Sequence, residues 1–363
     1  MKQRILSIDI FRGITIAFMI IVNTPGSWNY VYAPLLHASW HGCTPTDLVF
    51  PFFIFVVGLS MAFSMKNFEQ RSKSEWTTKI LKRTLAIFVV GFLLNWFPFY
   101  HKNILDVRFF GVLQRIALSY GIAALLILFI QKQKYLITTI VLGLVGYTIL
   151  MKLGGDFSLE NNLGKKVDSF LLPDNNLYGG FGTIFDPEGL LGSIPAAMQV
   201  IIGFLIGKFL IENKEQPIKF VMPALLIGVI FIVLAYFGLS LSAPINKPLW
   251  THSYVIYTSG IACLVLALLV YLVDVLKFQK WSIPFKIFGR NALFSYVLSG
   301  IIVKILITVF KYKDGNGYSY LYSEFFQPIF GNFRGSLAFA IFILSLVFIG
   351  AYTLYKKDIM IKL

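Results

Sequence analysis

Apolar runs of membrane-crossing length recur along the whole chain of 363 residues. A helix needs about 20 consecutive apolar residues to cross a bilayer, and hydrophobic residues make up 57% of this sequence against 13% charged ones. The alternating pattern of an outer-membrane barrel is not present. The sequence therefore predicts an all-α, polytopic transmembrane helical bundle of about ten helices, with residues 1–363 as a single domain. The predicted spans are Ile5–Asn23, Asp47–Met65, Lys79–Phe97, Phe110–Ile130, Tyr135–Lys152, Gly189–Leu210, Phe220–Leu241, Ser253–Val275, Phe288–Phe310 and Gly335–Tyr355.

Basic residues predict the orientation of this bundle. Lys and Arg are about twice as frequent in one set of alternate loops, which includes Lys2 and Arg4, as in the opposite set, and short basic loops stay in the cytoplasm. Both termini are therefore predicted to be cytoplasmic. The first run carries Asp9 and Arg12 and lacks a small-residue cleavage site, so it is predicted to remain as a span rather than to be removed as a signal peptide.

The net charge of +15 does not indicate nucleic-acid binding, because the basic residues are spread over many short loops instead of forming one patch. Membrane topology and contact with anionic lipid explain the charge better. We expect an integral membrane protein with membrane lipid as its surroundings and no nucleic-acid partner.

The polar stretch between the first two runs contains the residues best suited to chemistry. His37 lies in it, and Asp47 opens the second run directly. Histidine changes charge near neutral pH and can act as a general base, while a carboxylate at the edge of hydrocarbon needs a partner, water or a task. Asn23, at the end of the first run, either caps a turn or donates to a developing oxyanion. The alternative is an interfacial loop whose polar groups only cap helix ends.

Histidine spacing also raises the question of a metal. His37 and His41 form a His-x-x-x-His pattern, which places two rings on one face of a helix for zinc. Gly42 and Pro45 oppose a helix there, and the glutamate of the zinc-protease motif is missing. No metal site is predicted.

Charged residues inside the runs are costly in lipid, so they should pair or face the bundle interior. Arg12 and Arg290 lie near the predicted inner side, where a guanidinium suits an anionic cofactor arriving from the cytoplasm. Asp47 and Arg115 both begin runs at the outer mouth, each within about two turns of it, so the two charges could pair. The alternative for each is a helix-bridging charge without a functional role.

The longest polar connection, from Gly154 to Glu188, is predicted to lie outside as a lid, a binding surface or a plain connector. Asp186 and Glu188 close it at the mouth of the sixth run. Two carboxylates there suit an ammonium or hydroxyl groups of a substrate, or they are ordinary first-turn acids beside Pro187.

Several segments together resemble a known family. They are Ser7-Ile-Asp-Ile-Phe-Arg-Gly13, His37-Ala-Ser-Trp-His-Gly42, Asp47-Leu-Val-Phe-Pro-Phe-Phe-Ile-Phe55, Gly111-Val-Leu-Gln-Arg115 and Asp186-Pro-Glu-Gly-Leu-Leu-Gly192, with a weaker Asn291-Ala-Leu-Phe-Ser-Tyr296. In this order they resemble the heparan-alpha-glucosaminide N-acetyltransferase family of transmembrane acyltransferases, in a compact bacterial form without the luminal domain of the lysosomal members.

The resemblance implies an enzyme that transfers the acetyl group of cytoplasmic acetyl-CoA to the amine of a glucosamine-type sugar across a bacterial inner membrane. It implies that His37 is catalytic, with Asn23 and Asp47 assisting. The chain between Asn23 and His37 is a few residues longer than the family pattern, which weakens the transfer of that role to Asn23. The resemblance also suggests a homodimer. The remaining expected roles are cofactor binding by Arg12, Arg115, Arg290 and Asn291, and substrate binding by Trp40, Asp186 and Glu188.

Residue chemistry leaves the route and the acceptor open. His37 either removes a proton from the attacking amine or accepts the acetyl group itself before passing it on. Three other functions remain as alternatives: an O-acyltransferase of a cell-envelope glycan, a sugar or cation transporter, and a non-catalytic membrane scaffold. The intramembrane charges favour a transporter, but no internal repeat is visible.

Overall fold

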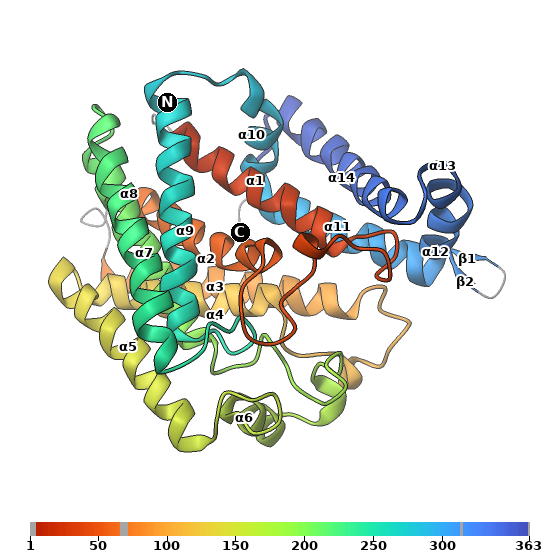
Figure 1. The fold of residues 1–363 in the computed structure, drawn as a ribbon, viewed down its shortest axis with the longest axis horizontal. Helices are drawn as coiled ribbons and strands as arrows, with labels where there is room; N and C mark the ends of the chain where they lie inside the picture. The colour runs from red at the N-terminus through yellow and green to blue at the C-terminus, as the bar shows by residue number, and fades with distance from the viewer. Residues whose placement is uncertain (1–4, 66–71, 313–314, 362–363) are drawn as a thin grey trace.

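A computed structural model describes residues 5–65, 72–312 and 315–361, and almost all of its regular structure is helical (Figure 1). The basic residues Lys2 and Arg4, used above to predict orientation, lie outside the described residues. The elements are α1 (Leu6–Asn23), α2 (Val49–Ser64), α3 (Lys73–Trp96), α4 (Val112–Phe129), α5 (Gln133–Gly154), α6 (Leu163–Leu171), α7 (Ser193–Glu212), α8 (Ile218–Val233), α9 (His252–Leu269), α10 (Ile283–Arg290), α11 (Ala292–Lys304), β1 (Lys311–Tyr312), β2 (Gly315–Asn316), α12 (Gly317–Leu321), α13 (Gln327–Phe330) and α14 (Asn332–Lys356).

Within the described residues, nine helices are long and apolar enough to cross a membrane. Four of them are longer than their α-helical parts. The helices α8, α9 and α11 continue through π or 3-10 turns to Leu241, Val275 and Val309, and a 3-10 turn that begins at Pro45 precedes α2. The predicted fold class, a polytopic helical bundle, is confirmed. The predicted span Lys79–Phe97 corresponds to α3, which begins earlier, carries several charged residues in its first half and is not one of the nine.

Hydrogen-bonded caps fix where the helices near the site begin. At the start of α3, the Ser72 hydroxyl accepts from the Glu75 N–H while the Glu75 carboxylate accepts from the Ser72 N–H. A similar reciprocal cap joins Thr44 and Asp47 in the 3-10 turn Pro45–Leu48, which leads directly into α2. Such caps satisfy backbone N–H groups that have no partner within the helix. The bond from the Thr44 N–H to the Asp47 carboxylate therefore holds Asp47 at the start of α2.

Glycines bring α2 and α7 into backbone contact at the centre of the bundle. A Cβ atom added at Gly58 would lie 2.0 Å from the carbonyl oxygen of Val200, and one at Gly203 would lie 2.2 Å from the carbonyl oxygen of Phe55. Only glycine permits this approach, which is a common way to pack helices in membranes. The pair positions α2, whose two ends carry the functional features described below.

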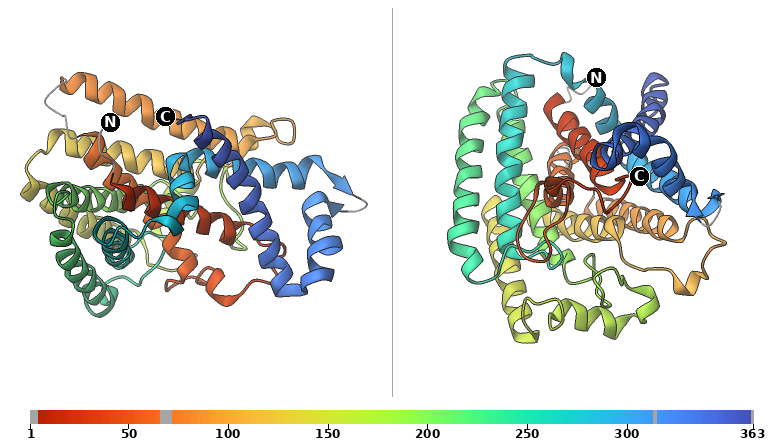
Figure 2. Two further views of the ribbon diagram at one scale, coloured as in Figure 1. Left: turned by 90° about the horizontal axis from the view of Figure 1, so that it is seen from above. Right: turned by 45° about the vertical axis from the view of Figure 1, so that its right-hand side comes forward.

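The predicted outer connections are folded segments. The connection from 154 to 192 contains α6 and lies at one end of the molecule, beyond the ends of α5 and α7 (Figure 1). The connection from 311 to 331 forms the short antiparallel pair β1–β2 and the helices α12 and α13, which project beside α14 (Figure 2). The first of these connections contacts the polar stretch around His37.

Candidate active site

The Asp47 carboxylate is almost completely buried, with 1% of the residue exposed, and its oxygens have separate partners. Oδ2 accepts from the backbone N–H groups of Ala38 and Thr44 and from the Thr44 hydroxyl, each at 3.0 Å. In addition, the Tyr254 hydroxyl donates to the Asp47 backbone carbonyl at 2.6 Å. A carboxylate that accepts several N–H bonds is stabilised in its ionised form. These contacts leave Oδ1 for other groups.

His37 contacts this second oxygen of Asp47. Its Nδ1 lies 2.6 Å from Asp47 Oδ1, and 44% of its side chain is exposed. The predicted contact between the two residues is therefore present. A proton on Nδ1 donated to Asp47 leaves the lone pair of Nε2 available, and Nε2 has no hydrogen-bond partner among the described residues. This geometry can take a proton from an incoming group or attack a carbonyl carbon.

Lys247 also lies at this site, and the sequence analysis did not identify it. Its Nζ lies 3.4 Å from Asp47 Oδ1 and 3.1 Å from His37 Nδ1. Burial lowers the pKa of Lys247, and the negative charges of Asp47 and Glu188 oppose this change. The signal in the sequence was a lysine between two prolines in a predicted outer loop, where basic residues are less frequent.

The nearby thiol of Cys43 is unsuited to nucleophilic attack. Burial, followed by the negative charge of Asp47, raises the pKa of Cys43 to about 12, although Lys247 acts in the opposite direction. The reactive form of cysteine is the thiolate, and this site disfavours it. Among the groups around Asp47, His37 is thus the best nucleophile or base.

Aromatic side chains form one wall beside this site. The Trp40 ring packs edge-on against Phe181 and Phe185, with centroids 5.9 and 5.5 Å apart. The Trp40 indole N–H donates to the Phe157 carbonyl at 2.8 Å, and Asn246 donates to the Trp40 carbonyl at 2.9 Å. Trp40, expected to bind substrate, is therefore held by both the 154–192 connection and the loop before α9.

Asp186 and Glu188, expected to bind substrate, are joined to an arginine instead of being left open. Arg108 donates to both oxygens of Asp186 at 2.8 and 2.7 Å and to Glu188 at 2.5 Å. Burial acts against the charge of Arg108, but its bonds to Asp186 and the charge of Glu188 raise its pKa overall. The Asp186 side chain is inaccessible and that of Glu188 is 13% exposed, so only Glu188 offers surface to a ligand.

Arg115 does not pair with Asp47, so that prediction is wrong. Its Nη2 donates to the Gly189 carbonyl at 2.8 Å and its guanidinium lies 5.3 Å from the centre of the Trp250 ring. Its Nε and Nη1 are buried without a hydrogen-bond partner among the described residues. The side chain faces the start of α7 because α4 packs against α7 there. Arg115, expected to bind cofactor, is not among the residues that line the cavity described next. Asn23, the last residue of α1, is exposed.

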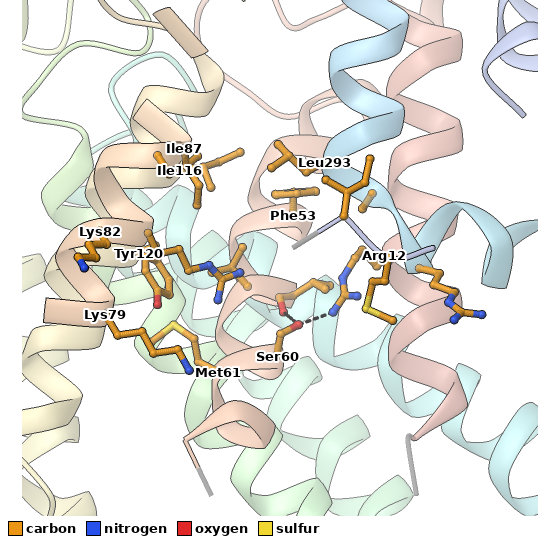
Figure 3. Close-up of a pocket in the computed structure, with 18 of the residues that line it drawn as sticks. Arg12, Phe53, Ser60, Met61, Lys79, Lys82, Ile87, Ile116, Tyr120 and Leu293 are labelled. Atoms are coloured by element: carbon orange, nitrogen blue, oxygen red, sulfur yellow. Dashed lines mark hydrogen bonds between the residues drawn. The ribbon is translucent and has the colours of Figure 1, made fainter. Parts of the chain in front are cut away.

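A cavity of about 1000 Å³ lies at the other end of α2. Figure 3 shows Arg12 on one side of it and Lys79 and Lys82 on the other, with Phe53 and Ser60 of α2 between them. The basic lining residues are Arg12, Lys79, Lys82, Arg83 and Arg290, and the acidic one among the described lining residues is Glu75. The cavity therefore has an excess of positive charge, which suits an anionic ligand.

Hydrogen bonds hold the cavity walls together. Arg12 donates to Ser60 and, at 3.0 Å, to the Gly289 carbonyl, which joins α1 to α2 and α10. Arg290 pairs with Asp358, and the Asn291 amide donates to the Ile359 carbonyl at 3.0 Å and accepts from the Ile361 N–H at 2.9 Å. Thus two of the expected cofactor residues, Arg12 and Arg290, line the cavity, while Asn291 anchors the 359–361 segment at its edge.

The two features share one helix. Phe53 lines the cavity and lies six residues after Asp47, which corresponds to a rise of about 9 Å along the helix axis. The Phe53 side of the cavity therefore lies on the same helix as Asp47. In the described ranges, 5–65, 72–312 and 315–361, no group of three or more His, Cys, Asp and Glu could hold a metal ion.

Comparisons with known proteins identify the family. A family model described as "Heparan-alpha-glucosaminide N-acetyltransferase, catalytic" matches residues 4–225. The human heparan-alpha-glucosaminide N-acetyltransferase is 29% identical over an alignment that covers all of this chain and 60% of the relative, and the mouse protein is 28% identical, with 99% and 61% covered. The chain thus spans about 60% of the length of the curated relatives it matches. Since the family model covers most of the chain, including the His37–Asp47 site and much of the cavity, the chain belongs to the heparan-alpha-glucosaminide N-acetyltransferase catalytic family.

Proposed function

We propose that this chain is a transmembrane N-acetyltransferase that moves an acetyl group from acetyl-CoA to the amine of a glucosamine-type sugar. The carrying observation is the arrangement of two unlike sites at the two ends of α2. One end has an imidazole oriented by a buried carboxylate, and the other has a cavity with an excess of basic residues.

The cavity suits the donor. Its volume of about 1000 Å³ and its arginines fit a thioester that carries phosphate groups, because guanidinium binds phosphate through two parallel hydrogen bonds. When bound, acetyl-CoA supplies the activated acetyl group. Arg12 and Arg290 would bind its anionic part, and the apolar residues nearer Phe53 would surround the arm that leads toward His37.

The site around His37 suits the transfer. In the direct route, His37 Nε2 removes a proton from the acceptor amine while the nitrogen attacks the acetyl carbonyl carbon. The carbon–sulfur bond then breaks, and the proton goes to the departing sulfur. In the covalent route, Nε2 itself attacks the acetyl carbonyl carbon and the carbon–sulfur bond breaks, which releases the thiolate. The amine then takes the acetyl group from the imidazole, and the proton that it loses goes to the thiolate. Asp47 orients the ring in both routes, and Asn23 is the proposed donor to the oxyanion.

The acceptor would bind against the aromatic wall. Trp40 offers a ring from the same loop as His37, and Glu188 offers a partly exposed carboxylate to an ammonium or hydroxyl group. Asp186 is fully covered by Arg108, so we assign it the support of this loop. We further propose that the cavity opens to the cytoplasm of a bacterial cell and His37 to the periplasm. Residues near both ends of the described chain, Arg12 and Ile361, line the same cavity, which supports placing both ends on one side of the membrane.

The test uses proteoliposomes with acetyl-CoA outside and glucosamine sealed inside. N-acetylglucosamine should form inside, through those molecules whose cavity faces outward. Acetyl esters without acetamides on a panel of glycans would identify the O-acyltransferase instead. Movement of sugar without any acetyl donor would identify a transporter. If no acetylated product forms and no CoA binding is detected, the proposal is contradicted.

A further inference from the structure

Lys247 lies against His37 through a network that joins two loops. The Gly42 N–H donates to the Ile245 carbonyl at 2.7 Å, and the Asn246 side chain donates to the Trp40 carbonyl and accepts from the Leu249 N–H at 2.8 Å. Lys247 follows Asn246 directly, and its side chain is 20% exposed. Its ammonium group is therefore held at a defined position beside the imidazole.

When the Nε2 lone pair of His37 is available, the hydrogen-bond donors and acceptors of this site permit one position for the imidazole proton, which is Nδ1. Asp47 Oδ2 already accepts from two backbone N–H groups and lies 3.0 Å from the Thr44 hydroxyl, whose single proton is also offered to the Leu36 carbonyl at 2.7 Å. Oδ1 serves both His37 Nδ1 at 2.6 Å and Lys247 Nζ at 3.4 Å. If Nδ1 carries a proton for Asp47, Lys247 cannot donate to it. The 3.1 Å separation of Nζ and Nδ1 is then a close approach of two donors that share one carboxylate oxygen.

The charges around the ring oppose each other. Asp47 alone would favour a protonated imidazole, and an ammonium group at 3.1 Å disfavours it. The other titratable groups of this environment come from each neighbouring element: Cys43, whose thiol stays protonated, Tyr254 of α9, and Glu188, whose charge acts on Lys247. The decisive balance is therefore between Asp47 and Lys247.

We propose that Lys247 is a positioning residue whose ammonium group balances the Asp47 carboxylate and so keeps the imidazole of His37 unprotonated, with the Nε2 lone pair available. Asp47 then orients the ring without charging it. The consequence for acetyl transfer rests on the function proposed above, but the charge state of His37 can be measured independently of it.

The first arm of the test measures charge directly. Diethyl pyrocarbonate reacts with neutral imidazole, and mass spectrometry of the full chain in detergent gives the labelling of each histidine as a function of pH. In Lys247→Met, the midpoint of His37 labelling should move upward by about one to two pH units, since a like charge within about 4 Å has an effect of that order. Lys247→Arg should restore the wild-type midpoint, and the exposed His101 should not change in any variant.

The matched control is Lys165→Met, which removes a lysine from the 154–192 connection, where it pairs with Glu160. It should leave the His37 midpoint unchanged. Asp47→Asn should move the midpoint downward. An unmoved midpoint in Lys247→Met, in a variant whose thermal unfolding matches that of the wild type, would overturn the proposal. A uniform loss of labelling at every pH would do the same, because it would indicate a purely structural role.

The second arm follows acetyl transfer. Lys247→Met should lose activity at low pH and approach the wild-type kcat near pH 9, where the imidazole is neutral in both proteins. If the labelling midpoint moves but the wild type transfers no acetyl group, the role of Lys247 holds and the proposed function fails. If transfer occurs but its pH profile and the labelling midpoint are unchanged in the variant, the function holds and the role of Lys247 is rejected.

Discussion

The two ends of α2 solve opposite electrostatic problems. At the Asp47 end, a buried carboxylate, an imidazole and a lysine lie within 3.4 Å of one another, and backbone N–H groups hold the carboxylate in place. At the Ser60 end, several basic residues and the acidic Glu75 surround a cavity of about 1000 Å³. The first region is neutralised by its own side chains, whereas the second retains positive charge for an external anion.

This difference indicates a division of roles along a single helix. A site whose charges are already paired and fixed needs little reorganisation when a proton moves, which suits chemistry. A cavity whose basic residues outnumber their acidic partners gains the remaining counter-charge from a ligand, which suits binding. Substitutions at the two ends should therefore affect different kinetic constants, and the following predictions test that separation.

The largest effect is expected from His37→Ala. Loss of a general base typically lowers rates by about 10²- to 10⁴-fold, and loss of a nucleophile lowers them at least as much. Donor binding should persist, because the cavity residues are unchanged. The matched control is His41→Ala, which removes the other exposed histidine of the loop. Steady-state acetylation and calorimetric CoA binding are measured for both variants. A fully active His37→Ala would show that the His37 end of α2 is not the site of chemistry.

A smaller effect, on stability, is expected from Asp47→Asn. Breaking a buried charge pair by removing one partner typically costs about 3–5 kcal/mol, because the other charge is left unpaired. The double variant Asp47→Asn with Lys247→Met should recover part of this loss, since it removes the orphaned ammonium. Chemical unfolding in micelles measures both. Additive losses would show that the two residues are independent, contrary to the paired state described here.

At the cavity end, Arg12→Gln should raise the KM for the donor about tenfold, the effect of losing about 1.4 kcal/mol from a charged contact, and leave kcat nearly unchanged. The loss should shrink at high salt. Lys208→Gln is the matched control, because this exposed α7 lysine does not line the cavity. A fall in kcat with an unchanged KM would contradict the division of roles.

The smallest effect concerns Asp168, a buried carboxylate of α6 in the 154–192 connection. Unlike Asp47, which has a salt bridge with Lys247, Asp168 accepts a hydrogen bond from the Leu190 N–H. Burial raises the pKa of Asp168 to about 6, with a further contribution from Asp186. Because the folded state then binds this proton more tightly than the unfolded state, stability should fall as pH rises from about 4 to 6 and stay level above.

Asp168→Asn removes this titration and keeps an acceptor for the Leu190 N–H, which Asp168 Oδ1 binds at 3.0 Å. The variant should be more stable than the wild type by about 1 kcal/mol at pH 7.5 and show no such gain at pH 4. Thermal unfolding at the two pH values measures the difference. If Asp168→Asn were more stable than the wild type only at acidic pH, the pH dependence would be opposite to the one expected, and this prediction would be wrong.

Hydropathy predicted the bundle because spanning helices must be apolar over most of their length. It also predicted a span at Lys79–Phe97, but the helix there, α3, is not among the nine candidate spans of the described residues because its first half is charged. The family resemblance implied that Asp47 assists His37, and the two side chains are in contact. The Asp47–Arg115 pair was predicted from depth alone and is wrong, because depth does not fix the face of a helix, and Arg115 faces α7.

Contacts between distant loops were beyond sequence reasoning. Lys247 reaches His37 only because Asn246 and Ile245 bind the loop of Trp40 and Gly42. Likewise, the sequence placed Asp186 and Glu188 at a helix start, but their partner Arg108 lies about 80 residues earlier. Such pairings depend on how the outer connections fold over one another, and one sequence does not encode them in a local pattern.

The backbone contact at Gly58 and Gly203 has a mechanical consequence. With a carbonyl oxygen seated where each side chain would start, α2 and α7 cannot slide or tilt past each other without separating. They form one closely packed pair at the centre of the bundle, and Ser60 and Asp47 keep their spacing because both belong to the continuous helical segment Pro45–Ser64. Movements that admit or release a ligand are therefore expected in the other elements that line the cavity, such as α3 and the 360–361 segment, and not between α2 and α7.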